Sequence, residues 1–89
     1  MRIVWDEAKR RANVRKHGFE FADAEAVLSG ITHVFEDDRF AYNERRFITL
    51  GLLKDTVVYI VHTDDAGDIR VISMRKATRY EEGLFFRNI

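Results

Sequence analysis

Three segments with the composition of β-strands follow one another in the second half of the chain, joined by short connections. Residues 46–53, 56–62 and 69–76 are rich in β-branched and aromatic side chains. A dipeptide separates the first two, and residues 64–68 carry the Asp and Gly typical of a turn before the third. Parallel neighbours would need a much longer crossover. The spacing therefore predicts antiparallel neighbours that form a β-meander.

Helices are expected on both sides of this meander in the sequence. Residues 7–17 form the first, because Asp6 can cap its N-terminus and Gly18 its C-terminus. Apolar residues at helical spacing predict a second helix at residues 21–28. Residues 78–81 have the Thr and Glu of a capping box, so a third helix is expected to begin there.

The order of these segments defines the fold class. An extended piece at residues 3–5 opens the chain, and residues 32–36 form a strand before a polar loop at residues 37–44. Two N-terminal helices, then strands, then a C-terminal helix predict an α+β fold, in which the helices pack on one face of an antiparallel sheet. The other face is expected to be free for a ligand. Residues 1–89 are expected to form a single domain, since no segment resembles a linker.

Composition excludes several classes of protein. The chain has no Cys, so disulfides and thiolate metal sites are excluded. Neither a membrane span nor a signal peptide is evident, and we expect a cytoplasmic protein that does not enter a membrane. The net charge is zero, but cations cluster at residues 9–16 and 70–79, and neither stretch contains an acid. Each stretch is either an ordinary solvated face or part of one composite basic surface.

Four polar residues share one face of the first expected helix, namely Lys9, Asn13, Lys16 and His17. Lys and His can contact phosphates, and Asn can bind a base or a backbone oxygen of a nucleic acid. The alternative is a solvated helix face, whose C-terminal cations interact favourably with the helix dipole.

The last expected strand carries a second set of cations. Alternation along it puts Arg75 on one face, and Arg70 and Lys76 on the other. With Arg79 at the start of the third helix, these cations predict a corner that attracts anions. The alternative is that Arg75 pairs with Glu81 or the glutamate after it, and is structural.

Proton transfer has two candidates, His62 and His17. Cleavage of RNA without a metal needs a base for the ribose 2′-hydroxyl, and cations for the charge that builds on phosphorus. Imidazole suits the proton role because it titrates near neutral pH. The alternative for either residue is a structural hydrogen bond. No pair of histidines has the spacing of metal ligands, so neither a metal nor another cofactor is expected.

Several longer motifs carry a family resemblance. Residues 5–18 match the pattern W-D-x-x-K-x-x-x-N-x-x-K-H-G, and Phe21 and Ala24 fit an F-x-x-A step. Residues 46–51 read R-F-I-x-x-G, and residues 69–78 read I-R-x-I-S-x-R-x-A-T. Over almost its whole length the chain thus resembles the BrnT family, within the RelE-like superfamily.

The resemblance implies a RelE-like fold, and a ribonuclease that blocks translation as the toxin of a type II toxin-antitoxin system. The implied partner is a BrnA-like ribbon-helix-helix antitoxin, in a heterotetramer that contacts operator DNA through the antitoxin. The positions that match the family pattern are Lys9, Asn13, Lys16, His17, Arg46, Arg70, Ser73, Arg75 and Glu81. Phe85 stands where such chains often have Tyr, and the apolar tail that follows either docks the partner or packs on the sheet.

Two hypotheses follow. In the first, the protein is a metal-independent endoribonuclease, in which Arg70 and Arg75 bind the scissile phosphate and His62 or His17 moves a proton. The residues expected to contact the RNA are Lys9, Asn13, Lys16, Arg46, Lys76 and Arg79. In the second, the protein is a catalytically inactive module that binds the antitoxin, or a co-repressor of its own operon.

Overall fold

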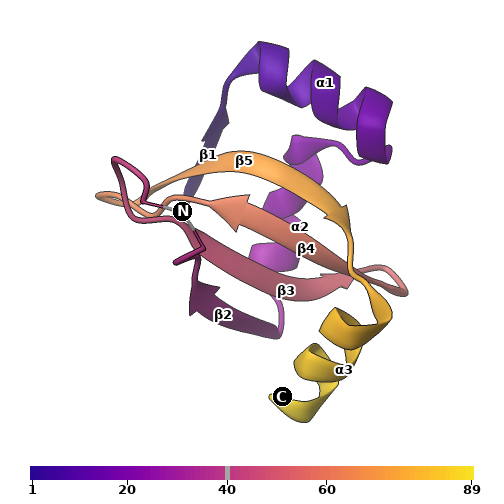
Figure 1. Cartoon of the computed structure of the whole chain (residues 1–89). Coiled ribbons are helices and arrows are strands. Elements are labelled where there is room, and N and C mark those ends of the chain that lie inside the picture. Colours follow the sequence, from indigo (N-terminus) through magenta and orange to yellow (C-terminus); the bar gives the residue numbers. More distant parts are fainter. Residues whose placement is uncertain (40) are drawn as a thin grey trace.

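The computed structural model describes residues 1–39 and 41–89 and confirms an α+β fold (Figure 1). The elements are β1 (Arg2–Trp5), α1 (Glu7–His17), the 3-10 turn η1 (Phe21–Asp23), α2 (Ala24–Leu28), β2 (Thr32–Glu36), β3 (Phe47–Leu53), β4 (Thr56–His62), β5 (Asp68–Lys76) and α3 (Arg79–Arg87). The first helix and the strands at residues 32–36 and 56–62 have the expected bounds. The expected polar loop at residues 37–44 includes Phe40, which lies outside the described residues.

The described strands form one sheet, in the order β1-β5-β4-β3-β2. β3, β4 and β5 pair antiparallel, which confirms the meander, and β2 pairs antiparallel with β3 at one edge. The expectation of an entirely antiparallel sheet was wrong, because β1 pairs parallel with β5 and places Trp5 opposite Val71. The long stretch of chain between these strands, α1 included, supplies the crossover that a parallel pair needs.

Two caps fix the ends of α1. The Asp6 side chain accepts a hydrogen bond from the backbone N–H of Lys9 at 3.0 Å. Gly18 has a φ of 77° and donates its backbone N–H to the Val14 carbonyl, which ends the helix. The orientation of the polar residues on α1 therefore follows from signals that the sequence contains.

The segment expected to form the second helix is less regular than α1 and depends more on packing. The second expected helix is not continuous, because η1 precedes the short α2. Phe21, Ala24 and Val27 are completely buried, so packing rather than helix length stabilises this segment. α3 begins with the expected capping box between Thr78 and Glu81. None of the described helices has the length and apolar character needed to cross a membrane.

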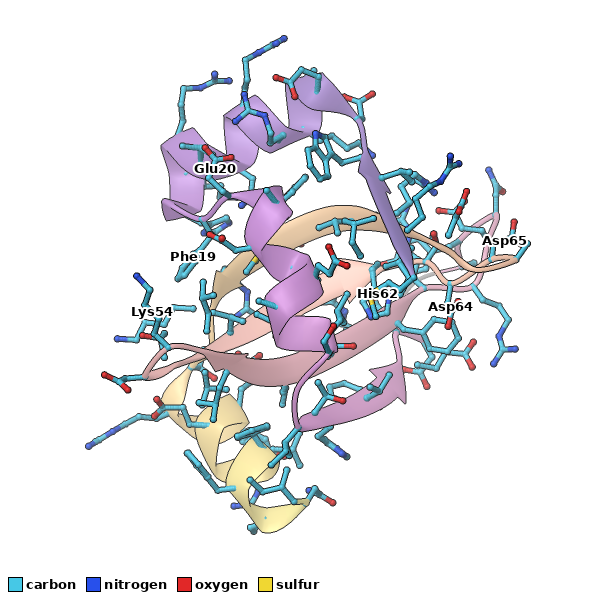
Figure 2. The ribbon with its side chains drawn as sticks, turned by 180° about the vertical axis from the view of Figure 1, so that it is seen from behind. Phe19, Glu20, Lys54, His62, Asp64 and Asp65 are labelled. Atoms are coloured by element: carbon cyan, nitrogen blue, oxygen red, sulfur yellow. The ribbon has the colours of Figure 1, made fainter. Side chains whose placement is uncertain are left out.

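The helices lie on both faces of the sheet, so the expectation that they share one face was wrong. α2 lies behind the sheet in Figure 1 and in front of it in Figure 2, whereas α3 packs on the opposite face. β4 explains this arrangement, because residues 57–62 are all buried. Val58 and Ile60 belong to the core under η1 and α2, while Val57 and Tyr59 belong to the core under α3. A strand that is apolar on both sides must be covered on both. We call the face that carries Tyr59 and α3 the front face.

Candidate nucleic-acid interface

A β-bulge in β5 changes the side-chain alternation of this strand. The register between β4 and β5 shifts, so that Val61 lies opposite Ser73 while the next residue, His62, lies opposite Val71. Ile72 is the additional residue. Ile72 packs against the core under α3, so Ile72 and Ser73 both lie on the front face. The expectation that side chains alternate strictly along this strand was therefore wrong.

The bulge brings Arg70 and Arg75 to the same face of the sheet. Val71 and Met74 are buried in the core under η1 and α2. Arg70 precedes Val71 and Arg75 follows Met74, so both arginines point to the front face. Lys76 lies opposite Val58 and points to the other face.

Asn13 attaches α1 to β5. Its side-chain amide donates to the carbonyls of Met74 at 2.8 Å and Phe19 at 3.1 Å, and its oxygen accepts from the Met74 backbone N–H at 3.1 Å. The amide thus pairs with β5 much as another strand would, beyond the end of β1. Asn13 is buried and both of its N–H donors are engaged. The Asn13 side chain therefore connects parts of the fold, whereas the sequence predicted that it contacts RNA.

An open groove runs between α1 and β5. Its lining residues are Lys9, Ala12, Asn13, Lys16, His17, Ile72 and Ser73. Partial burial lowers the pKa of His17 below its usual value, and the positive charges of Lys16 and Arg75 lower it further. His17 is therefore neutral near pH 7 and can accept a proton. The cations that line this groove come from α1, and Arg75 of β5 lies near enough for its charge to act on His17.

Arg75 is held in place by two neighbours. Its Nη1 and Nη2 donate to the two carboxylate oxygens of Glu81 at 2.8 and 3.0 Å, and its guanidinium carbon lies 3.7 Å from the centre of the Tyr59 ring. Pairing with Glu81, the alternative that the sequence left open, is thus present. Nη1 also donates to the Lys76 carbonyl. A guanidinium has five N–H donors. Glu81 and Lys76 accept hydrogen bonds from three of them and the Tyr59 hydroxyl is a further partner, which still leaves capacity for an anion.

Glu81 remains a carboxylate in this arrangement. Burial acts to raise its pKa, but hydrogen bonds from Arg75 and from the Thr78 backbone outweigh burial and lower the pKa. The charge that orients Arg75 is therefore permanent at neutral pH. Because Glu81 also caps α3, the position of Arg75 is coupled to the start of that helix.

A second group of cations on the front face surrounds one acid. Arg46 Nε and Arg70 Nη2 both donate to Oε1 of Glu44, at 3.1 and 3.2 Å. The Arg46 guanidinium also lies over the Tyr42 ring, 4.0 Å from its centre. The hydrogen bond from Arg46 lowers the pKa of Glu44 against the effect of burial, and the bond from Arg70 adds to it.

Asp37 anchors the connection between β2 and β3 that carries these residues. Its side chain is completely buried and accepts from Arg39 at 2.7 and 2.9 Å and from the Tyr42 hydroxyl at 3.1 Å. The hydrogen bond from Arg39 is the main reason that the pKa of Asp37 is lowered. Asp37 thereby holds Tyr42, and Tyr42 supports Arg46.

Two of the expected site residues do not lie on the front face. Lys76 points to the opposite face, and His62 is 4% exposed on the side of the sheet that α2 covers (Figure 2). The His62 ring nitrogens lie 2.7 Å from the Thr49 hydroxyl and 3.1 Å from the Thr63 carbonyl. Burial lowers the pKa of His62. Arg79 is exposed in the first turn of α3 and forms no ion pair with a described residue.

Tyr59 and Glu44 were not predicted from the sequence as residues of this site. Tyr59 lies opposite Arg75 in the register of β4 and β5 and is almost completely buried. Alternation could not assign Tyr59 to a face, because residues 57–61 of β4 are all apolar. Only the strand register reveals the contact with Arg75. Glu44 was part of an expected polar loop, and nothing in its local sequence indicates an acid shared by two arginines.

The front face is suited to a polyanion. Lys9 and Lys16 form no ion pair with any described residue, and the arginines Arg39, Arg46, Arg70 and Arg75 pair with the carboxylates of Asp37, Glu44 and Glu81. The described part of the chain contains no group of side chains arranged to hold a metal ion. The groove thus combines a neutral imidazole with ammonium groups, and the guanidinium of Arg75 lies near the imidazole. Such groups can move a proton and neutralise a phosphate.

Comparison with known proteins gives consistent matches. Residues 5–81 match the family model described as ribonuclease toxin, BrnT, of type II toxin-antitoxin system. The fold is similar to the 1.1 Å crystal structure of the ribonuclease toxin BrnT from Brucella abortus, with a TM-score of 0.69 and 31% sequence identity. That match covers 89% of this chain and 99% of the other. No curated protein sequence gives a significant match.

Proposed function

The chain belongs to the BrnT family of ribonuclease toxins of type II toxin-antitoxin systems, and from that premise we propose that it cleaves RNA at the groove between α1 and β5. The observation that carries this proposal is the groove in which Lys9, Lys16 and His17 lie beside β5, with Arg75 near enough for its charge to lower the pKa of His17. Lys9 extends the basic surface along α1 and binds the RNA backbone, as Lys16 does.

The proposed reaction needs no metal ion. His17, neutral at neutral pH, accepts the proton of the ribose 2′-hydroxyl as its oxygen attacks the adjacent phosphorus. Arg75 donates hydrogen bonds to the phosphate oxygens and neutralises the charge that develops there. The bond to the 5′-oxygen then breaks, and His17 can return the proton to that leaving oxygen. The products are a 2′,3′-cyclic phosphate and a 5′-hydroxyl.

The other expected site residues take different roles in this proposal. Asn13 positions α1, and His62 stabilises the sheet through its two hydrogen bonds. Glu81 and Tyr59 orient Arg75. Arg79 extends the basic surface at the start of α3, and Lys76 is left without a role in RNA binding because it points to the opposite face.

Cleavage of a labelled RNA by the purified protein in EDTA tests the mechanism. We expect cleavage with cyclic-phosphate ends, reduced about 100-fold or more in His17→Gln, since general base catalysis contributes that much. Arg11→Gln is the matched control, because Arg11 is a cation of the same helix that pairs with Glu7 and does not line the groove. Activity that disappears in EDTA and returns with Mg²⁺ would contradict the proposed chemistry.

For the partner, we propose a BrnA-like ribbon-helix-helix antitoxin in a cytoplasmic heterotetramer that binds operator DNA through the antitoxin. The end of α3 supports a docking role, because Phe86 and Ile89 are 58% and 56% exposed while Phe85 is buried in the core. Phe86→Glu is expected to prevent co-purification with the antitoxin while RNA cleavage continues. Unchanged co-purification would place the antitoxin elsewhere.

A further inference from the structure

We propose that Arg46 and Arg70 together form a second phosphate site, which binds the phosphate of a nucleotide flanking the cleavage position. Glu44 occupies this site in the free protein. The inference rests on the proposed function, because it assumes that an RNA strand crosses the front face to reach the groove.

The geometry around Glu44 supports a site for a phosphate anion. Two guanidinium groups, from Arg46 just before β3 and from Arg70 in β5, donate to the same carboxylate oxygen at 3.1 and 3.2 Å. Their donors therefore converge on a point where one oxygen of an anion fits. A phosphodiester has the same single negative charge as a carboxylate and two non-bridging oxygens, so it can replace Glu44 between the two arginines.

The weakness of the ion pair between Arg70 and Glu44 is consistent with replacement of Glu44 by a phosphate. Arg70 and Glu44 have side chains that are 38% and 39% exposed. Ion pairs that are this exposed are screened by water and contribute little to stability. Arg46 is held independently, since its guanidinium also stacks on Tyr42. The site therefore remains in place when Glu44 moves away.

Arg70, in this site, and Arg75 are far apart along β5. Arg70 and Arg75 are five positions apart with one residue in the bulge, so their Cα atoms are roughly 13–16 Å apart at the usual rise of a strand. Arg75 is directed to Glu81 on α3, and Arg70 to Glu44 in the connection before β3. A single phosphate does not bridge these two sites, so we assign Arg70 to a flanking phosphate and not to the scissile one.

Charge also restricts the direction of the RNA. The hollow beside Arg70 is lined by Thr63, Asp64 and Asp65, together with Glu44 and Arg45. Asp64 and Asp65 repel a phosphate backbone at the turn between β4 and β5. The strand therefore extends from the Arg46–Arg70 site toward Arg75, and not past the turn.

Binding of short and long RNA to the full protein tests this inference. The probes are a dinucleotide with one phosphate and an octanucleotide, both carrying 2′-O-methyl groups so that neither is cleaved. We expect Arg46→Gln and Arg70→Gln each to weaken octanucleotide binding about tenfold and to reduce its salt dependence by about one phosphate contact. Dinucleotide binding stays unchanged. Glu44→Gln, which removes the competing charge, is expected to tighten octanucleotide binding severalfold.

Arg11→Gln and Glu7→Gln are the matched controls. This is an exposed ion pair on α1, with 3.7 Å between Arg11 Nη1 and Glu7 Oε2, and neither residue lines the groove or the hollow beside Arg70. Circular dichroism establishes that each variant is folded. Equal weakening of both probes by Arg70→Gln would move Arg70 to the scissile phosphate and overturn the inference, as would no effect on either. Wild-type protein that binds neither probe would overturn the proposed function as well.

Discussion

Replacing Asn13 tests whether this residue stabilises the fold or contacts RNA. Asn13→Ala removes the partners of the Met74 N–H and C=O and of the Phe19 carbonyl. Met74 is completely buried, so water does not replace the lost bonds. Each buried group left without a partner costs about 1–3 kcal/mol, so the loss of partners for the two groups of Met74 lowers the free energy of unfolding by about 2–6 kcal/mol. For a domain of this size the melting temperature should fall by roughly 10–50 °C.

Urea unfolding measures this loss directly. Trp5 is the single tryptophan, and it packs edge-on against Phe21 in the core under α2, so its fluorescence reports unfolding. Asn13→Asp should be as harmful, because a carboxylate cannot donate to the two carbonyls and places a charge against them. Lys16→Ala is the control and should change stability by no more than about 0.5 kcal/mol. An Asn13→Ala protein of wild-type stability that has lost RNA affinity would refute the structural assignment.

Three further outcomes are expected. Gly51→Ala should lower the free energy of unfolding by about 1–3 kcal/mol, because its new Cβ would lie 2.7 Å from Val27 Cγ1 and 3.3 Å from Thr32 Cγ2; thermal melts measure this. The rate of RNA cleavage, measured as kcat/KM, should fall on acidification with a midpoint below pH 6.5, because the pKa of His17 is lowered and only the neutral imidazole is a base. A midpoint above pH 6.5 would exclude His17 as the base. Stability should also decline as pH falls below 6.5, because the lowered pKa of His62 keeps it neutral in the fold while the unfolded chain binds a proton. Substituting His62 by Gln should weaken this pH dependence in urea titrations.

Local signals in the sequence predicted α1 and the meander well. The caps of α1 are the residues next to it, Asp6 and Gly18, and they act in the structure as expected. The strands of the meander are joined by short connections, so their pairing required no information from distant parts of the chain. The parallel pairing of β1 with β5 was missed, because it joins residues far apart in the sequence.

The candidate site was predicted only in part, for a related reason. The basic residues of α1 and β5 were identified from composition, and Arg75 was recognised together with its possible partner Glu81. The amide of Asn13 looks polar and exposed in a helical pattern, and only the packing of α1 on β5 shows that it is buried. His62 was selected for its chemistry, but burial depends on the position of its strand in the sheet.

The additional residue in β5 has a consequence for comparing related sequences. Ile72 lies between the part of the strand that pairs with β1 and the part that bears Arg75. A relative that lacked one residue here would need a gap at the bulge for its basic positions to correspond in space. An alignment that placed the gap elsewhere would equate a side chain on the front face with one that points to the face covered by α2. Homologues of this chain are therefore best aligned outward from the bulge, with each half of the strand counted separately.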